Sequence, residues 1–157
     1  MSPPRPDVLI LTTRTARPED LPALRALDPL AATDVARRDH LAESLTAATC
    51  FVATDAHGRP IGYATFHHRF FGHGLIEFLV THPAHRRQGV ASALIQHCER
   101  HACQTPKLFT STNRSNTPMR ALLAKLGFTQ TGTIDGLDEG DPELIYVKRL
   151  MTPPSQR

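Results

Sequence analysis

An apolar run that leads directly into a helix constrains this chain more than any other feature of its sequence. The run LIEFLV covers residues 75–80, and the loop THPAHRRQG joins it to VASALIQHC. An almost wholly apolar strand fits the centre of a sheet better than an exposed position. Val90, Leu94 and Cys98 then recur at the spacing of one helix face. The segment therefore predicts a buried strand followed by an amphipathic helix from about residue 88 to about residue 103.

Strands and helices are mixed along the rest of the chain. The patterns predict further strands within residues 8–16 and at 50–54, 61–71, 107–113, 129–134 and 143–150, and helices at 18–30, 37–48 and 115–128. This mixture indicates an α/β or α+β fold with helices on both faces of a sheet.

Length and composition fit one domain. The chain has 157 residues, 40% of them hydrophobic, which is enough for a single core over residues 1–157. The proline-rich ends at 1–8 and 151–157 are expected to fray around a core of about 9–150.

Charge and cysteine content argue against several classes of protein. The net charge of +3 is too small, and its carriers too scattered, for a nucleic-acid partner. No apolar run approaches the roughly 20 residues that span a bilayer, so no membrane partner is expected. The start of the chain lacks the pattern of a signal peptide. Three cysteines without metal-binding spacing predict a cytoplasmic protein with no disulfide framework and no metal site.

The loop before the predicted helix combines two arginines with small residues. A helix N-terminus carries free N–H groups and a partial positive charge, and together these bind phosphates. Arg86 and Arg87 add forked donors, while Gly89 and Ala91 leave room for a bulky pyrophosphate. The alternative is a surface loop in which Gly89 only makes a tight turn. The P-loop and the dinucleotide fingerprint are both absent, so the pattern R-x-x-G-x-A indicates a different phosphate ligand.

This pattern, within FLVTHPAHRRQGVASALI, resembles the pyrophosphate-binding motif Q/R-x-x-G-x-G/A of the GNAT superfamily of acyl-CoA-dependent N-acyltransferases. A second segment, NTPMRALLAKLGF, resembles the later motif of that family, an asparagine and then a helix that ends in Gly-Phe. The order of the predicted elements matches the family from about residue 11 to about residue 150. The resemblance implies a mixed, mostly antiparallel sheet of six to seven strands, splayed at the cofactor site, with helices on both faces.

The resemblance also implies an activity. The chain is expected to be an N-acetyltransferase that moves an acetyl group from acetyl-CoA to an amine of a small molecule or a protein by direct attack. Homodimers are common in the superfamily, so a second copy is an expected partner beside the amine acceptor. The residues implied to hold the cofactor are Leu79 and Val80 along the pantetheine arm, Asn116 beside it, and Arg86, Arg87, Gln88, Gly89, Val90, Ala91 and Ser92 around the pyrophosphate. A backbone N–H near Leu79 or Val80 would polarise the thioester carbonyl.

Two side chains are candidates for proton transfer. Glu77 is the only charged residue in its apolar strand, and burial would raise its proton affinity toward that of a useful base. The alternative is that Glu77 faces solvent or pairs with an arginine. Many relatives have an acidic tyrosine where this chain has Leu123, so Tyr146, on the last predicted strand, is the candidate acid. The missing tyrosine also leaves open a non-catalytic acyl-CoA-binding or regulatory module.

Histidines and an acidic loop are the remaining candidates. His67 or His68 could line a cleft as a base, and His97 and His101 have the spacing of a metal pair. Exposed positions are the simpler interpretation for all four. Residues 135–143 hold five carboxylates but lack the spacing of a calcium loop. They predict either a solvated turn or a mouth that attracts a cationic amine.

Overall fold

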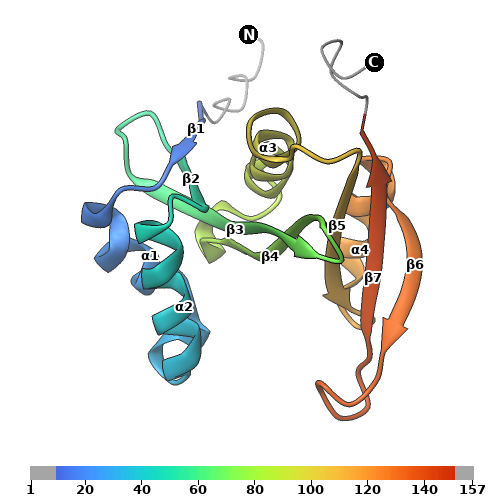
Figure 1. The fold of residues 1–157 in the computed structure, drawn as a ribbon. Helices are drawn as coiled ribbons and strands as arrows, with labels where there is room; N and C mark the ends of the chain where they lie inside the picture. The colour runs from blue at the N-terminus through green and yellow to red at the C-terminus, as the bar shows by residue number, and fades with distance from the viewer. Residues whose placement is uncertain (1–9, 151–157) are drawn as a thin grey trace, which may run out of the picture. The chain divides into compact units, whose positions relative to one another are not determined.

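The computed structural model describes residues 10–150, so the predicted frayed ends at 1–8 and 151–157 lie outside the described residues (Figure 1). Seven strands form one sheet in the order β1-β2-β3-β4-β5-β7-β6. The strands are β1 (Thr12–Thr15), β2 (Cys50–Thr54), β3 (Pro60–Phe70), β4 (His73–Thr81), β5 (Lys107–Asn113), β6 (Thr129–Ile134) and β7 (Glu143–Arg149). The helices are α1 (Leu21–Leu27), α2 (Val35–Thr46), α3 (Val90–His97) and α4 (Thr117–Lys125).

The pairing of the strands confirms the expected mixed sheet. β1 with β2, β5 with β7 and β6 with β7 are antiparallel, whereas β4 with β5 is parallel. The register of the parallel pair joins Gly74–Ile76 to Leu108–Thr110 only, although β5 continues to Asn113. This short ladder agrees with a sheet that opens between β4 and β5.

Three predicted helices are shorter than the sequence pattern suggested, and the one expected over 115–128 spans Thr117–Lys125. The helix expected over 18–30 ends at Leu27, because Asp28 precedes Pro29 and takes the extended backbone that a following proline favours. Short 3₁₀ turns, η1 (Pro18–Asp20) and η2 (Pro29–Ala32), flank α1. The helix expected over 88–103 begins two residues later, at Val90, and its last turn, Cys98–Ala102, is a π-helix.

The chain divides into two compact units. Unit 1 holds the residues up to Tyr63 together with Leu79–Leu94, and unit 2 holds Ala64–Phe78 together with the residues from Ile95 onward. The single domain over residues 1–157 stays a prediction.

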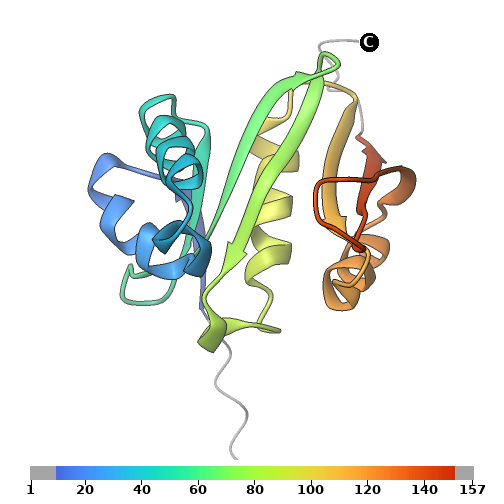
Figure 2. The same ribbon diagram turned by 90° about the horizontal axis from the view of Figure 1, so that it is seen from below.

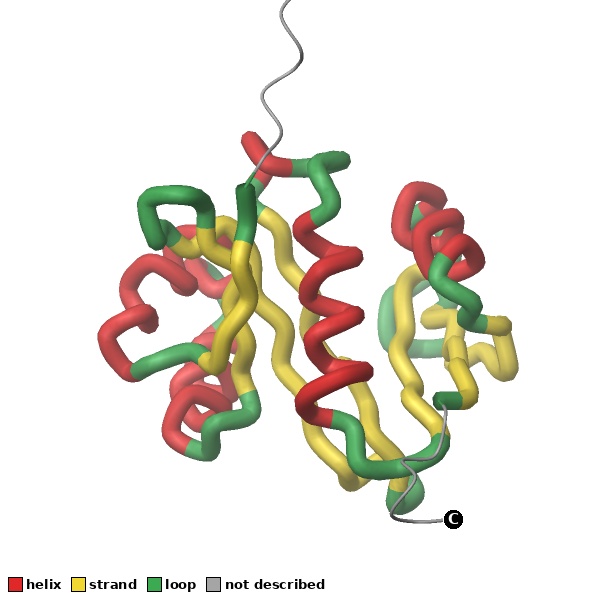
Figure 3. The backbone as a smooth tube through the Cα atoms, turned by 90° about the horizontal axis from the view of Figure 1, so that it is seen from above, coloured by secondary structure: helices red, strands yellow, loops and turns green. Residues whose placement is uncertain are grey.

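In unit 1, helices cover both faces of the strands. An added Cβ on Gly62 of β3 would lie 2.6 Å from Val90 and 3.3 Å from Leu94, so this face packs against α3. The next residue, Tyr63, points the other way and bonds Asp28, at the end of α1. Figure 3 shows the same arrangement, with α3 on one side of β1 and β2 and with α1 and α2 on the other.

In unit 2, the helical segments lie on one face of the strands. Lys148 of β7 reaches Glu99 at 2.9 Å and lies over the ring of Phe128, which follows α4. Phe109 of β5 points to the opposite face, since residues alternate along a strand, and packs against Phe70 at 5.0 Å between ring centroids. This second face is only half-buried.

Candidate functional site

The junction between β4 and α3 has an unusual backbone. After β4, His82 accepts a hydrogen bond from the Ala84 amide at 3.0 Å and starts a 3₁₀ turn, η3 (Pro83–His85). Arg87 then has φ +62° and Gly89 has φ +86°. Glycine tolerates the left-handed region, but an arginine there is strained, and such strain collects at functional sites.

The first turn of α3 presents unpaired amides. The Gly89 carbonyl accepts the Ala93 amide at 3.0 Å, so the helical ladder starts at that bond. The amides of Val90, Ala91 and Ser92 precede it and have no acceptor within the helix. No side chain in residues 10–150 is bonded to them. The helix itself is firmly held, because Leu94 is fully buried and Val90 is 1% exposed.

The space in front of this helix start is open. A Cβ added to Gly89 would meet no atom within 4 Å. The loop exposes Arg86, Arg87 and Gln88. Nδ1 of His85 lies 3.3 Å from Oε1 of Gln88, a contact between the two ends of this short segment. Exposed guanidinium groups, three outward amides and the positive end of a helix suit a bulky anion. The structure therefore brings together every predicted residue from Arg86 to Ser92.

The two predicted backbone contacts on β4 differ in direction. The His82 amide donates to the Ile61 carbonyl at 2.8 Å, and the Val80 carbonyl would lie 2.9 Å from a Cβ on Gly62. Val80 and His82 therefore face β3. Because backbone groups of successive strand residues point to opposite edges, those of Leu79 point away from β3. Of the two residues, only Leu79 presents its N–H and C=O to the edge opposite β3.

Asn116 starts α4, in unit 2. Its side-chain oxygen accepts the Met119 amide at 3.3 Å, which caps the helix, and its own amide donates to the Asn113 carbonyl at 3.0 Å. Since the oxygen is engaged, the exposed side chain offers its NH₂ group to a ligand as a donor.

Glu77 has an exposed side chain, although its apolar neighbours in the sequence suggested burial. Its side chain is 36% exposed while Ile76 is 1% exposed, because alternate residues of a strand face opposite sides of the sheet. Its carboxylate lies 3.7 Å from Nε2 of His67. Nδ1 of that ring accepts the Arg69 amide at 3.0 Å, so a neutral His67 carries its proton on Nε2, toward Glu77. The structure thus pairs two candidates that the sequence left separate.

The tyrosines have different surroundings. Tyr146 is 5% exposed on β7, and its hydroxyl has no hydrogen bond among residues 10–150. Leu123, which the sequence resemblance aligns with a tyrosine of many relatives, is also buried, at 1% exposure. Tyr63 donates to Asp28 at 2.6 Å, and burial together with this carboxylate raises the pKa of the Tyr63 hydroxyl far above its usual value. Because Tyr63 is fully buried and its hydroxyl is bonded to Asp28, it is not a candidate for the acid that protonates a leaving thiolate.

Asp28 belongs to a buried cluster that sequence reasoning missed. Arg37 donates to Asp28 at 2.5 Å, and the Leu30 amide donates to it at 3.1 Å. These contacts and the Tyr63 hydroxyl outweigh desolvation and keep the pKa of Asp28 below its usual value. The partners lie 9 and 35 residues away in sequence, so no local pattern signals the cluster. It connects α2 and β3 to the end of α1 in unit 1.

The remaining histidine candidates, His68, His97 and His101, make contacts within the chain. The rings of His97 and His101 are in tilted contact with centroids 4.9 Å apart, and burial, followed by the charge of His101, lowers the pKa of His97. His68 accepts the Gln104 amide at 3.0 Å. In the part of the chain that the structure describes, no group of three or more His, Cys, Asp or Glu side chains is placed to hold a metal ion.

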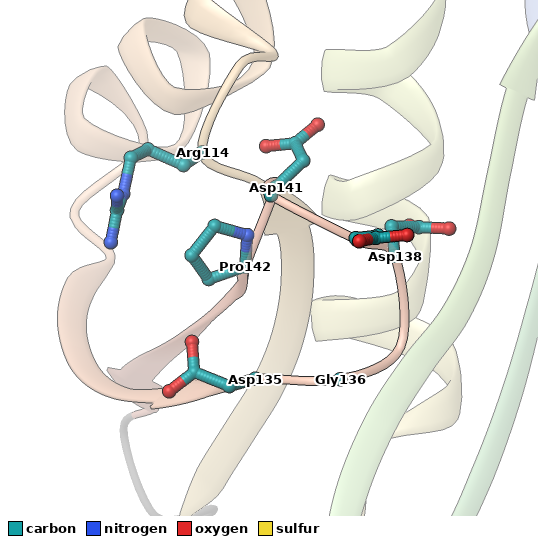
Figure 4. Close-up of a pocket in the computed structure, with 8 residues that line it drawn as sticks. Arg114, Asp135, Gly136, Asp138, Asp141 and Pro142 are labelled. Atoms are coloured by element: carbon teal, nitrogen blue, oxygen red, sulfur yellow. The ribbon is translucent and has the colours of Figure 1, made fainter.

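The acidic loop lines an open pocket of about 410 Å³ (Figure 4). Arg114 and Pro142 form part of its wall together with Asp135, Asp138, Glu139 and Asp141. Two of these carboxylates are bonded by residues between β5 and α4: Asn113, the last residue of β5, donates to Asp138 at 2.9 Å, and Ser115 bonds Asp141 through both its amide and its hydroxyl. The loop is therefore not a purely solvated turn.

Comparison with known proteins identifies a family. The model of the acetyltransferase (GNAT) family matches residues 15–128. No curated protein sequence matches the chain. No helix among residues 10–150 has both the length and the apolar character that a membrane span requires.

Several solved structures are similar to the chain. A GNAT-family acetyltransferase from Bacillus cereus ATCC 10987 is 28% identical, covers 90% of this chain and 99% of its own, and superposes with a TM-score of 0.83. An N-acetyltransferase from Staphylococcus aureus Mu50 is 22% identical over 90% and 99% of the two chains, with a TM-score of 0.71. Naa20 from Chaetomium thermophilum, in complex with a bisubstrate analogue, is 22% identical over 88% and 86%, with a TM-score of 0.70. The last two similarities concern the fold alone.

Proposed function

The chain belongs to the GNAT acetyltransferase family and is an acyltransferase, and from this premise we propose that the β4–α3 junction binds the pyrophosphate of acetyl-CoA. The family generally uses this donor. One observation carries the proposal: Arg87 and Gly89 both have left-handed backbones in front of a helix whose first amides have no acceptor among residues 10–150. The β3–β4 turn also has two left-handed residues, Phe71 and Gly72, but those at the α3 junction lead into a helix start and do not close a hairpin. An arginine held in this strained form is better explained by a ligand that its loop must match.

The remaining cofactor contacts follow from the directions of the groups. Leu79 would bond the pantetheine arm through its backbone and help to polarise the thioester carbonyl. Val80, whose carbonyl faces β3, would line the arm with its side chain. Asn116 would donate its NH₂ group to a carbonyl oxygen of the arm, because its own oxygen caps α4.

We propose direct attack by an amine. The amine nitrogen bonds to the acyl carbon, the C–S bond breaks, and the nitrogen releases a proton while the thiolate takes one up. Glu77 would accept the proton, with His67 orienting its carboxylate through Nε2. Tyr146 or water would protonate the thiolate.

The acyl acceptor is defined only as a class of compounds, whereas the proposed donor is one molecule, acetyl-CoA. We propose an amine of a small molecule or a protein, and the similar fold of Naa20, solved with a bisubstrate analogue, is compatible with either. We also propose a cytoplasmic protein, which its three free cysteines support, and a homodimer as its assembled state. Neither a membrane nor a nucleic-acid partner forms part of the proposal.

Titration of acetyl-CoA and free CoA into the protein by calorimetry tests the donor. Binding of both is expected, because the pyrophosphate is common to them, and release of free thiol with some amine of a panel would identify the acceptor class. Binding without turnover on any small amine would favour a protein acceptor or a binding module. Absence of binding would remove the pyrophosphate assignment.

The base is tested by Glu77→Gln at saturating amine. A large loss of kcat at neutral pH, with unchanged acetyl-CoA affinity, is expected for the residue that takes the proton. His67→Gln keeps a donor near Glu77 and should lose less than His67→Ala. An unchanged pH–rate profile in Glu77→Gln would exclude Glu77 as the base.

A further inference from the structure

We propose that Asp141 is a positioning residue that holds Asn116 in place for the cofactor arm. The inference rests on the proposed function, in which Asn116 contacts acetyl-CoA. It assigns the acidic loop, residues 135–142, a role in donor binding.

The contacts of Asp141 are specific and involve both carboxylate oxygens. One oxygen accepts the Ser115 amide at 3.0 Å, and the other accepts the Ser115 hydroxyl at 2.5 Å. Ser115 immediately precedes Asn116, the cap of α4. Charge-assisted bonds of this length are stronger than bonds between neutral groups, so Asp141 fixes the backbone one residue before the cap.

Further bonds join the same two segments. Asn113 donates its side-chain NH₂ to Asp138 at 2.9 Å and to the Asp141 carbonyl at 3.2 Å. The Arg114 amide donates to the Pro142 carbonyl at 2.9 Å. We call the segments 113–115 and 138–142, joined by these bonds, the loop clamp. Figure 2 shows the β6–β7 loop beside the start of α4.

The carboxylates of the loop therefore fall into two groups. Asp138 and Asp141 are engaged in the loop clamp, whereas Glu139 is exposed and has no hydrogen bond to another described residue. A loop that served only as a solvated turn would not direct two of its carboxylates at the residues before a helix cap. The division also supplies a matched control within the same loop.

The side chain of Asn116 needs such support because its one hydrogen bond to another described residue is long. Its capping bond is 3.3 Å long, and its side chain is exposed. When a hydrogen-bond donor lies on a loosely held loop, ordering that loop on binding lowers the affinity for the ligand. A donor on a preorganised loop avoids this cost. The loop clamp therefore acts on donor affinity through the position of Asn116.

Calorimetric titration of acetyl-CoA into Asp141→Ala, Asp141→Asn and Glu139→Ala tests the inference. Asp141→Ala should weaken binding on the order of tenfold, the effect of one well-placed hydrogen bond, while kcat at saturating acetyl-CoA changes little. Asp141→Asn retains an acceptor for Ser115 and should recover most of the affinity. Glu139→Ala should bind acetyl-CoA like the parent.

A second comparison separates positioning from a general structural role. In an Asn116→Ala background, adding Asp141→Ala should cause no further loss of affinity, because the two residues act through one contact. Additive losses, or a lower Tm of Asp141→Ala with unchanged affinity, would overturn the inference. Failure of the parent itself to bind acetyl-CoA would overturn the proposed function and the inference together, whereas parent binding that Asp141→Ala retains in full overturns the inference alone.

Discussion

Two junctions where a strand leads into a helix, β4–α3 and β5–α4, are built in opposite ways. At α4, the Asn116 side chain caps the helix and the loop clamp fixes the residues before it. At α3, the N-cap is Gly89, which has no side chain to offer, and the preceding loop is exposed. The first amides of α4 are therefore bonded within the chain, whereas those of α3 are available to a ligand.

The difference shows how a chain divides binding between backbone and side chains. The α3 junction offers an anion its backbone amides and a helix dipole, which no single side-chain substitution removes. The α4 junction offers one side-chain donor in a fixed place. Substitutions should therefore act on the first junction through shape and strain, and on the second through capping and chemistry.

The largest effect is expected for Gly89→Val. A branched side chain in front of the free amides would occupy the space that the pyrophosphate needs and would also strain a backbone at φ +86°. We expect acetyl-CoA affinity to fall by roughly a hundredfold or more, equivalent to about 3 kcal/mol. Calorimetry measures the loss, and circular dichroism checks that the fold is retained.

Gly58→Val is the matched control for this substitution. Gly58 has φ +76° and open space around its Cβ position, but it lies in the β2–β3 turn. Both variants should lose similar stability, and only Gly89→Val should lose affinity. Equal affinities in the two variants would mean that the α3 junction is an ordinary turn.

A smaller and divisible effect is expected at Asn116. Asn116→Ala removes both the cap and the donor, so it should cost about 1 kcal/mol of unfolding free energy and also weaken acetyl-CoA binding. Asn116→Asp keeps an oxygen for the Met119 amide but has no NH₂ group. It should keep the Tm of the parent and still bind acetyl-CoA more weakly. Parent-like affinity in Asn116→Asp would limit the residue to capping.

The smallest effect is expected for Arg87→Gly, which should raise the stability of the protein and lower its affinity for acetyl-CoA. Glycine relieves the strain at φ +62°, so the free energy of unfolding should rise by about 0.5–1 kcal/mol. Loss of one exposed guanidinium should weaken acetyl-CoA binding by roughly fivefold. Arg87→Lys keeps the charge and the strain, so it should show neither the gain in the free energy of unfolding nor a comparable loss of acetyl-CoA affinity. A destabilised Arg87→Gly would mean that the arginine is not strained.

The sequence predicted the strands and the α3 junction well because their signals are local. Every predicted strand is present, and the R-x-x-G-x-A pattern marks a helix start that the structure places at Val90. Pro29 was a local signal too, since the residue before a proline avoids helical backbone, and it explains why α1 ends at Leu27.

What the sequence did not predict depends on contacts between distant residues. The bond between Tyr63 and Asp28 spans 35 positions, and the bonds between Ser115 and Asp141 span 26. For Glu77, the sequence left a buried base and a solvent-facing position both open, and the structure shows an exposed side chain. An apolar run favours a strand that is buried on both faces, but the face that carries Glu77 is only half-covered in unit 2.

The loop clamp has a consequence for the solvent protection of the backbone. The Arg114 and Ser115 amides belong to exposed residues in a connecting loop, where rapid hydrogen exchange is the usual behaviour. Here, both amides donate to acceptors across the clamp, Pro142 and Asp141. Their exchange should therefore be slow in the parent, and Asp141→Ala should accelerate it at Ser115 first. A surface loop would then exchange on the timescale of the β-strands that it connects.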